Sequence, residues 1–174
     1  MTLQPTTPLE ELAGHNVLKT DADAGSRLQV GDWYLTWKAQ GEDTGFAFSV
    51  YETVLVPGRG IPLHKHPYAE FFYVLEGTID FCRWSDSGAA EWLICSVGTS
   101  VLAPPNAPHT FLNKSGQPAR MLSVSTYHHE RMLKEGVNPG GNLHHLPAEL
   151  SPTDFARFFK SLEKDQAYVV ADHA

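Results

Sequence analysis

The pattern of apolar and polar residues along the chain predicts a succession of short strands. Such strands are expected at DWYLTWKA (residues 32–39), at FAFSVYETVLV (46–56) and in the run MLSVSTY (121–127). Turn-forming residues separate them at regular intervals, which favours a sandwich or barrel over a fold of alternating strands and helices. The segments IDFCRW (79–84) and EWLICSV (91–97) flank SDSGAA and predict a hairpin. We therefore expect an all-β fold, for which a jelly-roll barrel is the simplest arrangement.

The pattern changes towards the C-terminus, where it predicts a helix. Ser151 can cap this helix with Pro152 in the first turn, and Asp154 stands where a capping box usually has Glu or Gln. Apolar residues then follow at i, i+3, i+4 and i+7, namely Phe155, Phe158, Phe159 and Leu162. This spacing predicts an amphipathic α-helix at about residues 152–164 whose aromatic stripe packs into the core.

A single domain accommodates the whole pattern, because 174 residues with 42% apolar content suffice for one hydrophobic core. Within residues 1–174 we expect an N-terminal arm at 1–28, a barrel at 29–127 and a C-terminal extension at 128–174 that carries the helix. Residues 1–28 are rich in Thr, Pro, Asp and Ala and show little periodicity. This composition fits an arm that lies on the barrel or is exchanged between subunits, and equally a disordered tail.

Two histidines and a glutamate stand in a spacing suited to binding a metal ion. The stretch G-x5-H-x-H-x3-E-x6-G comprises Gly58, His64, His66, Glu70 and Gly77. Because His64 and His66 are two residues apart, an extended strand places their side chains on one face, about 6.6 Å apart. Glu70 has the same parity, and so do the apolar residues Phe72 and Val74. Unpaired charges on such an apolar face are costly to bury, and a divalent cation would offset that cost.

A second stretch with a fixed spacing follows the first. It reads G-x5-P-x-N-x2-H-x3-N and comprises Gly98, Pro104, Asn106, His109 and Asn113. Over roughly residues 45–126 the two stretches resemble the signature of the cupins, a superfamily of small β-barrels. The resemblance implies a cupin jelly-roll barrel with a metal site formed by His64, His66, Glu70 and His109. Asn106 stands where the family pattern has glycine, but asparagine accepts a positive φ better than most residues.

The implied ligand set bears on the metal and on its reactivity. Three neutral imidazoles and one carboxylate form a borderline set that suits several divalent ions. We expect one iron ion first, with nickel, manganese, zinc and copper as alternatives. Four protein ligands on an ion that prefers five or six leave one or two open positions, as in a catalytic site.

The chain resembles quercetin dioxygenase-like cupins in particular, which implies a metal-dependent dioxygenase for a small enolic or aromatic substrate. In that family the glutamate can act as a base on the substrate hydroxyl, so Glu70 is the candidate catalytic residue. Phe72 and Phe111 share the parity of Glu70 and His109 and are candidates for a hydrophobic pocket wall, although large aromatics are equally typical of a barrel core. Two alternatives stay open: a redox-neutral isomerase or lyase with the metal as Lewis acid, and a non-catalytic small-molecule-binding cupin.

Charge and composition exclude several other classes of function. A net charge of −7 without a cluster of Lys or Arg argues against nucleic-acid binding. The sequence contains no apolar run of transmembrane length and no signal peptide, so we expect a cytoplasmic protein that does not bind membranes. Cys82 and Cys95 lie on the two arms of the predicted hairpin, and without an export signal we expect reduced core thiols.

The sequence leaves open what covers the outer face of the strand that carries Glu70, and which face of the segment 46–56 points inward. Phe71, Tyr73 and Leu75 lie on the outer face of the strand that carries Glu70, and we expect the C-terminal helix or a second subunit to cover them. Since cupins are commonly dimers, a homodimer is expected. In the segment 46–56, Phe46, Phe48 and Glu52 share one face and Tyr51 occupies the other, and the sequence does not fix which face points inward. Glu52 is expected at the surface or in a structural ion pair.

The histidines outside the two stretches carry little signal. His128 and His129 are adjacent, as are His144 and His145, and adjacent residues do not face one way. We expect these pairs at the surface or behind the ligands. His15 and His173 lie near the ends of the chain.

Overall fold

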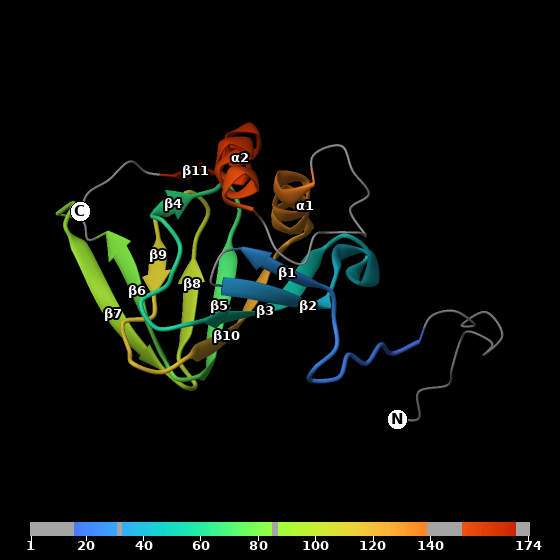
Figure 1. Ribbon diagram of the computed structural model, residues 1–174, viewed down its shortest axis with the longest axis horizontal. Helices are drawn as coiled ribbons and strands as arrows, with labels where there is room; N and C mark the ends of the chain where they lie inside the picture. Colours follow the sequence, from blue (N-terminus) through green and yellow to red (C-terminus); the bar gives the residue numbers. More distant parts are fainter. Residues whose placement is uncertain (1–15, 31–32, 85–86, 139–150, 170–174) are drawn as a thin grey trace, which may run out of the picture.

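Antiparallel strands form two principal sheets in the computed structural model, which describes residues 16–30, 33–84, 87–138 and 151–169 (Figure 1). The larger sheet has six strands in the order β1-β2-β3-β10-β5-β8. Their bounds in that order are Arg27–Val30, Trp33–Ala39, Phe48–Leu55, Ala119–Thr126, Glu70–Glu76 and Ser100–Ala103. The smaller sheet has the order β7-β6-β9, with bounds Ala90–Ser96, Thr78–Trp84 and Thr110–Leu112. The predicted β architecture and the hairpin of β6 and β7 are confirmed.

The two sheets enclose a core to which both contribute. One buried cluster comprises Leu55, Phe72, Val74, Ile79, Phe81, Cys95, Ala103, Phe111, Ala119 and Met121. Burial alternates strictly along β3 and β10, as expected where one face of a sheet is covered. Tyr51 belongs to the inward face of β3 and is 3% exposed, whereas Phe46 and Phe48 are exposed. The outward Glu52 lies 3.2 Å from Arg120 and 3.7 Å from Lys38, so it is part of an ion-pair network outside the core.

The C-terminal helix α2 (Pro152–Leu162) agrees with the sequence prediction. Ser151 caps it, because the Ser151 hydroxyl accepts a hydrogen bond of 3.2 Å from the backbone N–H of Asp154. The predicted last two residues belong instead to the 3₁₀ turn η3 (Glu163–Asp165). Phe158 and Leu162 are buried as predicted, and the side chains of Phe155 and Phe159 lie outside the described part.

A second helix, α1 (Tyr127–Val137), was not predicted from the sequence. Its inward positions fall at i, i+3, i+4, i+7 and i+8 and are His129, Met132, Leu133, Gly136 and Val137. Because a histidine and a glycine occupy two of these positions, the stripe does not read as apolar. Gly136 permits close packing of the helices, since a Cβ there would lie 2.5 Å from the ring of Phe158.

The two helices build a second core at one end of the barrel. This cluster comprises Leu28, Leu35, Trp37, Tyr51, Tyr68, Met132, Leu133, Val137, Phe158, Leu162 and Ala167. After η3 the chain forms β11 (Tyr168–Val169), which pairs with β4 (His64–Lys65). Figure 1 shows α1, α2 and β11 together above the ends of the sheets. The expectation that α2 covers the outer face of β5 is wrong, because α2 packs on α1 while Phe71 and Tyr73 stay exposed.

The turn at Asn106 and the two cysteines can be compared with the expectations from the sequence. Asn106 has φ of +63°, so it fills the left-handed turn position that glycine has in the family pattern. Cys82 and Cys95 are both buried and free, and the register places Cys82 opposite Trp92 and Cys95 opposite Ile79. The two thiols therefore do not face one another.

The ends of the chain are described only in part. Of the expected arm, residues 16–28 are described, and Lys38 ties them to β2 through hydrogen bonds from its ammonium to the carbonyls of Asp21, Ala22 and Ala24. His15, His144, His145 and His173 lie outside the described residues. Within the described part, the helices are too short and too polar to cross a membrane.

Candidate metal centre

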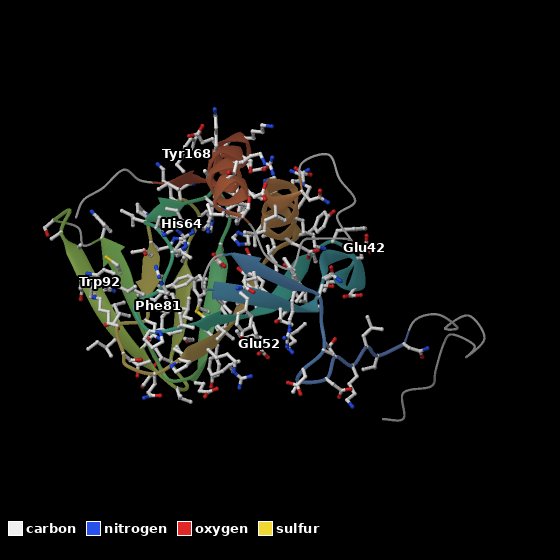
Figure 2. The ribbon with its side chains drawn as sticks, in the orientation of Figure 1. Glu42, Glu52, His64, Phe81, Trp92 and Tyr168 are labelled. Carbon is white, nitrogen blue, oxygen red and sulfur yellow. The ribbon has the colours of Figure 1, made fainter. Side chains whose placement is uncertain are left out.

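The side chains of His64, His66, Glu70 and His109 come together in one group. Figure 2 shows His64 at the end of the barrel, beneath the helices. Each offers one ligand atom, and these four atoms all lie within 4.8 Å of one another. Main-chain pairing brings the two halves of the site together, because His64 and His109 exchange backbone hydrogen bonds of 3.0 and 2.9 Å. His66 follows β4 directly and Glu70 begins β5, so both ligands face the same end of the barrel.

The three imidazoles are oriented by backbone carbonyls two residues away. Nδ1 of His64 lies 3.0 Å from the carbonyl oxygen of Pro62. Nδ1 of His66 lies 2.8 Å from the carbonyl oxygen of Tyr68, and Nδ1 of His109 lies 2.8 Å from that of Ala107. A carbonyl oxygen only accepts, so each Nδ1 carries a proton, and in the neutral ring this leaves the lone pair of Nε2 free for a metal. This arrangement is typical of histidines that bind a metal through Nε2.

The free lone pairs point at a carboxylate rather than at a donor. Oε2 of Glu70 lies 3.3 Å from Nε2 of His66 and 3.8 Å from Nε2 of His109. Nε2 of His109 is buried and has no hydrogen-bond partner. Bare nitrogens beside a carboxylate oxygen repel it unless a cation lies among them. The group could therefore hold a divalent cation, and its nitrogen and oxygen donors suit a borderline metal.

Burial keeps these ligands in the charge states that a metal requires. Burial and the neighbouring His109 lower the pKa of His64 to about 3, so its imidazole is neutral at physiological pH. Burial alone would raise the pKa of the Glu70 carboxyl, but the imidazoles of His129, His109 and His66 outweigh it and hold the pKa well below its usual range. His64 thus offers a neutral imidazole and Glu70 a carboxylate to a metal.

Behind the ligands lies a hydrogen-bonded group that sequence reasoning did not assign to the site. The Tyr51 hydroxyl donates to Oε1 of Glu70 and also lies 3.2 Å from Nε2 of His129. Nδ1 of His129 lies 3.1 Å from the hydroxyl of Tyr68. His129 is buried, whereas its neighbour His128 is half-exposed and lies 3.4 Å from Asp165. The signal that could have found His129 is its i, i+3, i+4 spacing with Met132 and Leu133.

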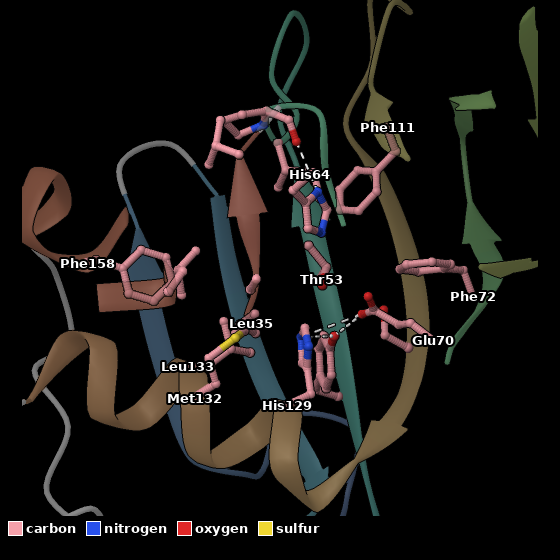
Figure 3. A pocket seen from close by; sticks show the side chains of 17 residues that line it. Leu35, Thr53, His64, Glu70, Phe72, Phe111, His129, Met132, Leu133 and Phe158 are labelled. Atoms are coloured by element: carbon pink, nitrogen blue, oxygen red, sulfur yellow. Dashed lines mark hydrogen bonds and ion pairs between the residues drawn. The ribbon is translucent and has the colours of Figure 1, made fainter. Parts of the chain in front are cut away.

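A cavity of about 70 Å³ opens beside the candidate metal ligands His64 and Glu70 (Figure 3). Phe72 and Phe111, the expected pocket residues, both line it, and α2 and β11 contribute Phe158 and Val169. The polar lining side chains include Tyr51 and His129, beside the carboxylate. Among the described residues that line the cavity there is no Lys or Arg. The walls are therefore mostly apolar, and the polar lining residues are Tyr51, Thr53, His64, Glu70, Ser123 and His129.

A comparison with protein families bears directly on this barrel. Residues 51–125 match the family model described as a cupin domain. This stretch, which is less than half of the chain, is similar to a cupin domain. The match includes the four clustered residues, and the mostly β cupin fold with a C-terminal helical segment is thereby confirmed.

Solved structures show the same fold at low sequence identity. A sugar phosphate isomerase of the cupin superfamily from Silicibacter pomeroyi is 24% identical, with a TM-score of 0.52 over 63% of this chain and 75% of the other. An oxalate oxidase is 16% identical, with a TM-score of 0.54 over 69% of this chain and 64% of the other. At these identities the likeness concerns the fold and not the reaction.

One curated relative is more similar over a shorter stretch. Glucose-6-phosphate isomerase from Thermococcus gammatolerans is 32% identical over 81 residues, which cover 41% of this chain and 43% of the relative. The chain thus matches less than half the length of that relative. The names of these similar proteins include isomerases and an oxidase, so the choice of reaction depends on the site.

Proposed function

We propose that this cupin is a metal-dependent dioxygenase that acts on a small, largely apolar enolic or aromatic substrate. His64, His66, Glu70 and His109 would hold the metal, with iron as the first candidate. When bound, the metal would supply a Lewis-acidic position for a substrate oxygen and an open position for dioxygen. The small-molecule substrate would enter the cavity beside Glu70.

The observation that carries this proposal is the apolar character of the cavity. Its lining includes Leu35, Phe72, Phe111, Met132 and Phe158, and no Lys or Arg lies among the described lining residues. A phosphorylated sugar needs cationic or multiple hydrogen-bonding partners for its phosphate and hydroxyl groups. The described lining offers no Lys or Arg for a phosphate group, whereas an aromatic ring and dioxygen, itself a small apolar molecule, suit the apolar part of these walls.

Glu70 is the proposed base. Its carboxyl group is held ionised, as its low pKa indicates, and it borders the cavity, so it can accept the proton of an enolic hydroxyl placed beside it. Phe72 and Phe111 would bracket the substrate and exclude water from the reacting atoms. The cavity of about 70 Å³ has room for a few waters only, so α2 and β11 would shift to admit an aromatic ring.

A redox-neutral isomerase is the second candidate. The similarity to glucose-6-phosphate isomerase, at 32% identity over 81 residues, favours it. In that case the metal would polarise a carbonyl or enediol, and Glu70 would move a proton between two carbons. The two candidates share the ligands and the base and differ in substrate polarity and in the need for dioxygen.

An oxygen electrode separates these candidates. Protein purified without a nickel column and reconstituted with Fe²⁺, Mn²⁺ or Ni²⁺ is mixed with flavonols, catechols, β-diketones and glucose 6-phosphate. We expect oxygen uptake with at least one of the apolar enolic substrates. Product formed without dioxygen would favour the isomerase, and saturable binding without product would favour a non-catalytic binding module.

Glu70→Gln tests the proposed base in the same assay. It should lower turnover by about 10²–10⁴-fold, the usual contribution of a general base, while the amide oxygen keeps the site occupied by metal. Glu52→Gln is the matched control, since Glu52 is a carboxylate that lies outside the core in an ion-pair network with Arg120 and Lys38. Normal turnover in Glu70→Gln would exclude the base role.

A further inference from the structure

The two oxygens of Glu70 have different surroundings. Oε2 faces the candidate metal ligands, at 3.3 Å from Nε2 of His66 and 3.8 Å from Nε2 of His109. Oε1 faces away from them and accepts a hydrogen bond from Tyr51, while Nε2 of His129 lies 3.7 Å away. Figure 3 shows His129 and the carboxylate of Glu70 side by side at the edge of the cavity. One oxygen is therefore available for a metal and the other is engaged.

The number of protons in the group fixes the direction of each hydrogen bond. Burial raises the pKa of the Tyr51 and Tyr68 hydroxyls, so both remain protonated. Tyr51 has one hydroxyl proton and gives it to the ionised Glu70. It can then only accept from His129, so Nε2 of His129 carries the proton and donates across 3.2 Å.

The same reasoning continues to Tyr68. With its proton on Nε2, the neutral ring of His129 has a bare Nδ1. Nδ1 of His129 then accepts from the Tyr68 hydroxyl at 3.1 Å, in preference to the sulfur of Met132, a weaker acceptor that lies 3.1 Å from the same hydroxyl. All three hydrogen bonds point the same way, from Tyr68 to His129, from His129 to Tyr51 and from Tyr51 to Oε1 of Glu70. Each group is satisfied only while Oε1 remains an acceptor.

We propose that Tyr51, supported by His129, is a positioning residue that keeps Oε1 of Glu70 away from the metal. Glu70 would then occupy one coordination position through Oε2. A carboxylate without such a partner can bind a metal through both oxygens, which would use a position that a substrate oxygen or dioxygen needs. This inference rests on the proposed function only where it assigns the free coordination position to a substrate oxygen or dioxygen. The geometry of the carboxylate can be tested without any substrate.

The packing around the group supports a positioning role. The rings of Tyr51 and His129 are parallel within 3°, with centroids 6.0 Å apart. Both side chains are buried, and both come from elements with extensive packing, Tyr51 from the middle of β3 and His129 from the first turn of α1. Side chains fixed by their surroundings can hold a ligand in one orientation, which is the usual function of residues behind a metal ligand.

Water-proton relaxation of Mn²⁺-loaded protein measures the number of waters on the metal. Six-coordinate Mn²⁺ with three imidazoles and one carboxylate oxygen has two waters, and with both carboxylate oxygens it has one. We expect Tyr51→Phe to lower the relaxation enhancement per bound Mn²⁺ by about half at saturating metal. An unchanged enhancement in Tyr51→Phe would overturn the proposal.

Two controls separate positioning from a general disturbance of the barrel. Ser49 lies two residues from Tyr51 on the same face of β3, and its buried hydroxyl has no hydrogen-bond partner. Ser49→Ala should therefore leave the relaxation enhancement at the wild-type level. Adding Tyr51→Phe to Glu70→Gln should leave the enhancement at the value of Glu70→Gln alone, because Tyr51 acts through that carboxylate. A further decrease in the double variant would contradict the proposal.

Variants of His129 provide a second test if Tyr51→Phe fails to fold or to bind Mn²⁺. His129→Leu removes the donor to Tyr51 and should shift the enhancement in the same direction, whereas His129→Gln keeps an N–H near the Nε2 position and should restore it. Equal values for His129→Leu, His129→Gln and wild type would overturn the inference. Should wild-type protein bind Mn²⁺ as described but consume no dioxygen, only the proposed function would fail.

Discussion

At the scale of single residues, the candidate centre combines groups that the sequence could indicate with groups that it could not. His64, His66, Glu70 and His109 were predicted because their spacing on strands and turns is nearly a local property. Tyr51 and His129 contact Glu70 only through tertiary packing, from 19 residues before it and 59 residues after it. Since the alternation of β3 allowed either face to point inward, only the assembled barrel could show that Tyr51 does.

The burial of His129 makes stability depend on pH in a defined direction. Its pKa is lowered from 6.5 to about 4 in the folded protein, so the unfolded chain binds more protons between these values. Stability is therefore lost as the pH falls from about 6.5 towards about 4. Urea unfolding of metal-free protein at pH 7 and pH 5 should show wild type losing about 2 kcal/mol more than His129→Gln, which has no titrating group there. Equal losses in the two proteins would show that His129 is not buried as a neutral ring.

At the scale of elements, helix α1 positions His129 and also receives α2. Two hydrogen bonds fix α1 on the segment that follows β2: the N–H of Gly41 donates to Oε2 of Glu130 at 2.7 Å, and Lys134 Nζ donates to Oε1 of Gln40 at 2.6 Å. Within α1, Lys134 Nζ also lies 2.6 Å from Oε1 of Glu130. Sequence periodicity found α2 because apolar residues recur in it at helical spacing, and among the described side chains Phe158 and Leu162 point inward. The same periodicity missed α1 because three of its buried residues, His129, Glu130 and Lys134, are polar. A pattern that counts only apolar residues does not register them.

Close packing of α1 and α2 is testable at Gly136. A Cβ at this position would lie 2.5 and 2.8 Å from ring atoms of Phe158, which also lines the cavity. Gly136→Ala should therefore lower the free energy of unfolding by about 1–3 kcal/mol, as overpacking does, despite the better helix propensity of alanine. Gly116→Ala is the control, because no atom lies within 4 Å of its added Cβ, and a change within about 0.5 kcal/mol is expected. Urea denaturation gives both values, and equal stability of the two variants would contradict the close approach.

At the scale of the whole molecule, the outer face of the larger sheet carries an apolar row that no described helix covers. Cross-strand pairing aligns Val50, Val124, Phe71 and Leu102, and Phe71 and Leu102 are 37% and 62% exposed. Arg120, Glu52 and Glu76 border the row with charges of both signs. A patch with both signs at its rim is complementary to itself under a twofold axis. We therefore propose that a second copy of the chain covers it, as the expected homodimer requires.

Sedimentation velocity tests this assembly. Wild type should sediment as a dimer at micromolar concentration, and Leu102→Lys should shift it towards monomer because a charge would be buried within the interface. Ile94→Lys is the control, since Ile94 is 77% exposed on β7 of the smaller sheet. A monomeric wild type, or an equal effect of the two variants, would remove the proposal.

The sequence predicted the barrel as a whole because strand alternation and turn residues are strong local signals. It could not predict what lies over each face, since α2 satisfies the amphipathic pattern equally well on β5 or on α1. Tertiary packing decides between such placements, and here the second core around Met132 and Phe158 does so.

The hydrogen bonds around the candidate metal ligands have a consequence for how this chain can evolve. Each histidine is oriented by a main-chain carbonyl, of Pro62, Tyr68 and Ala107, and a carbonyl persists whatever side chain a point mutation introduces. Glu70 is oriented by the side chains of Tyr51 and His129, each of which a single codon change can replace. Substitutions at positions 51 and 129 can therefore change the orientation of the Glu70 carboxylate while the orientations of the three imidazoles stay the same. Related chains that have drifted towards new reactions should differ at positions 51 and 129 before they differ in the geometry of their histidines.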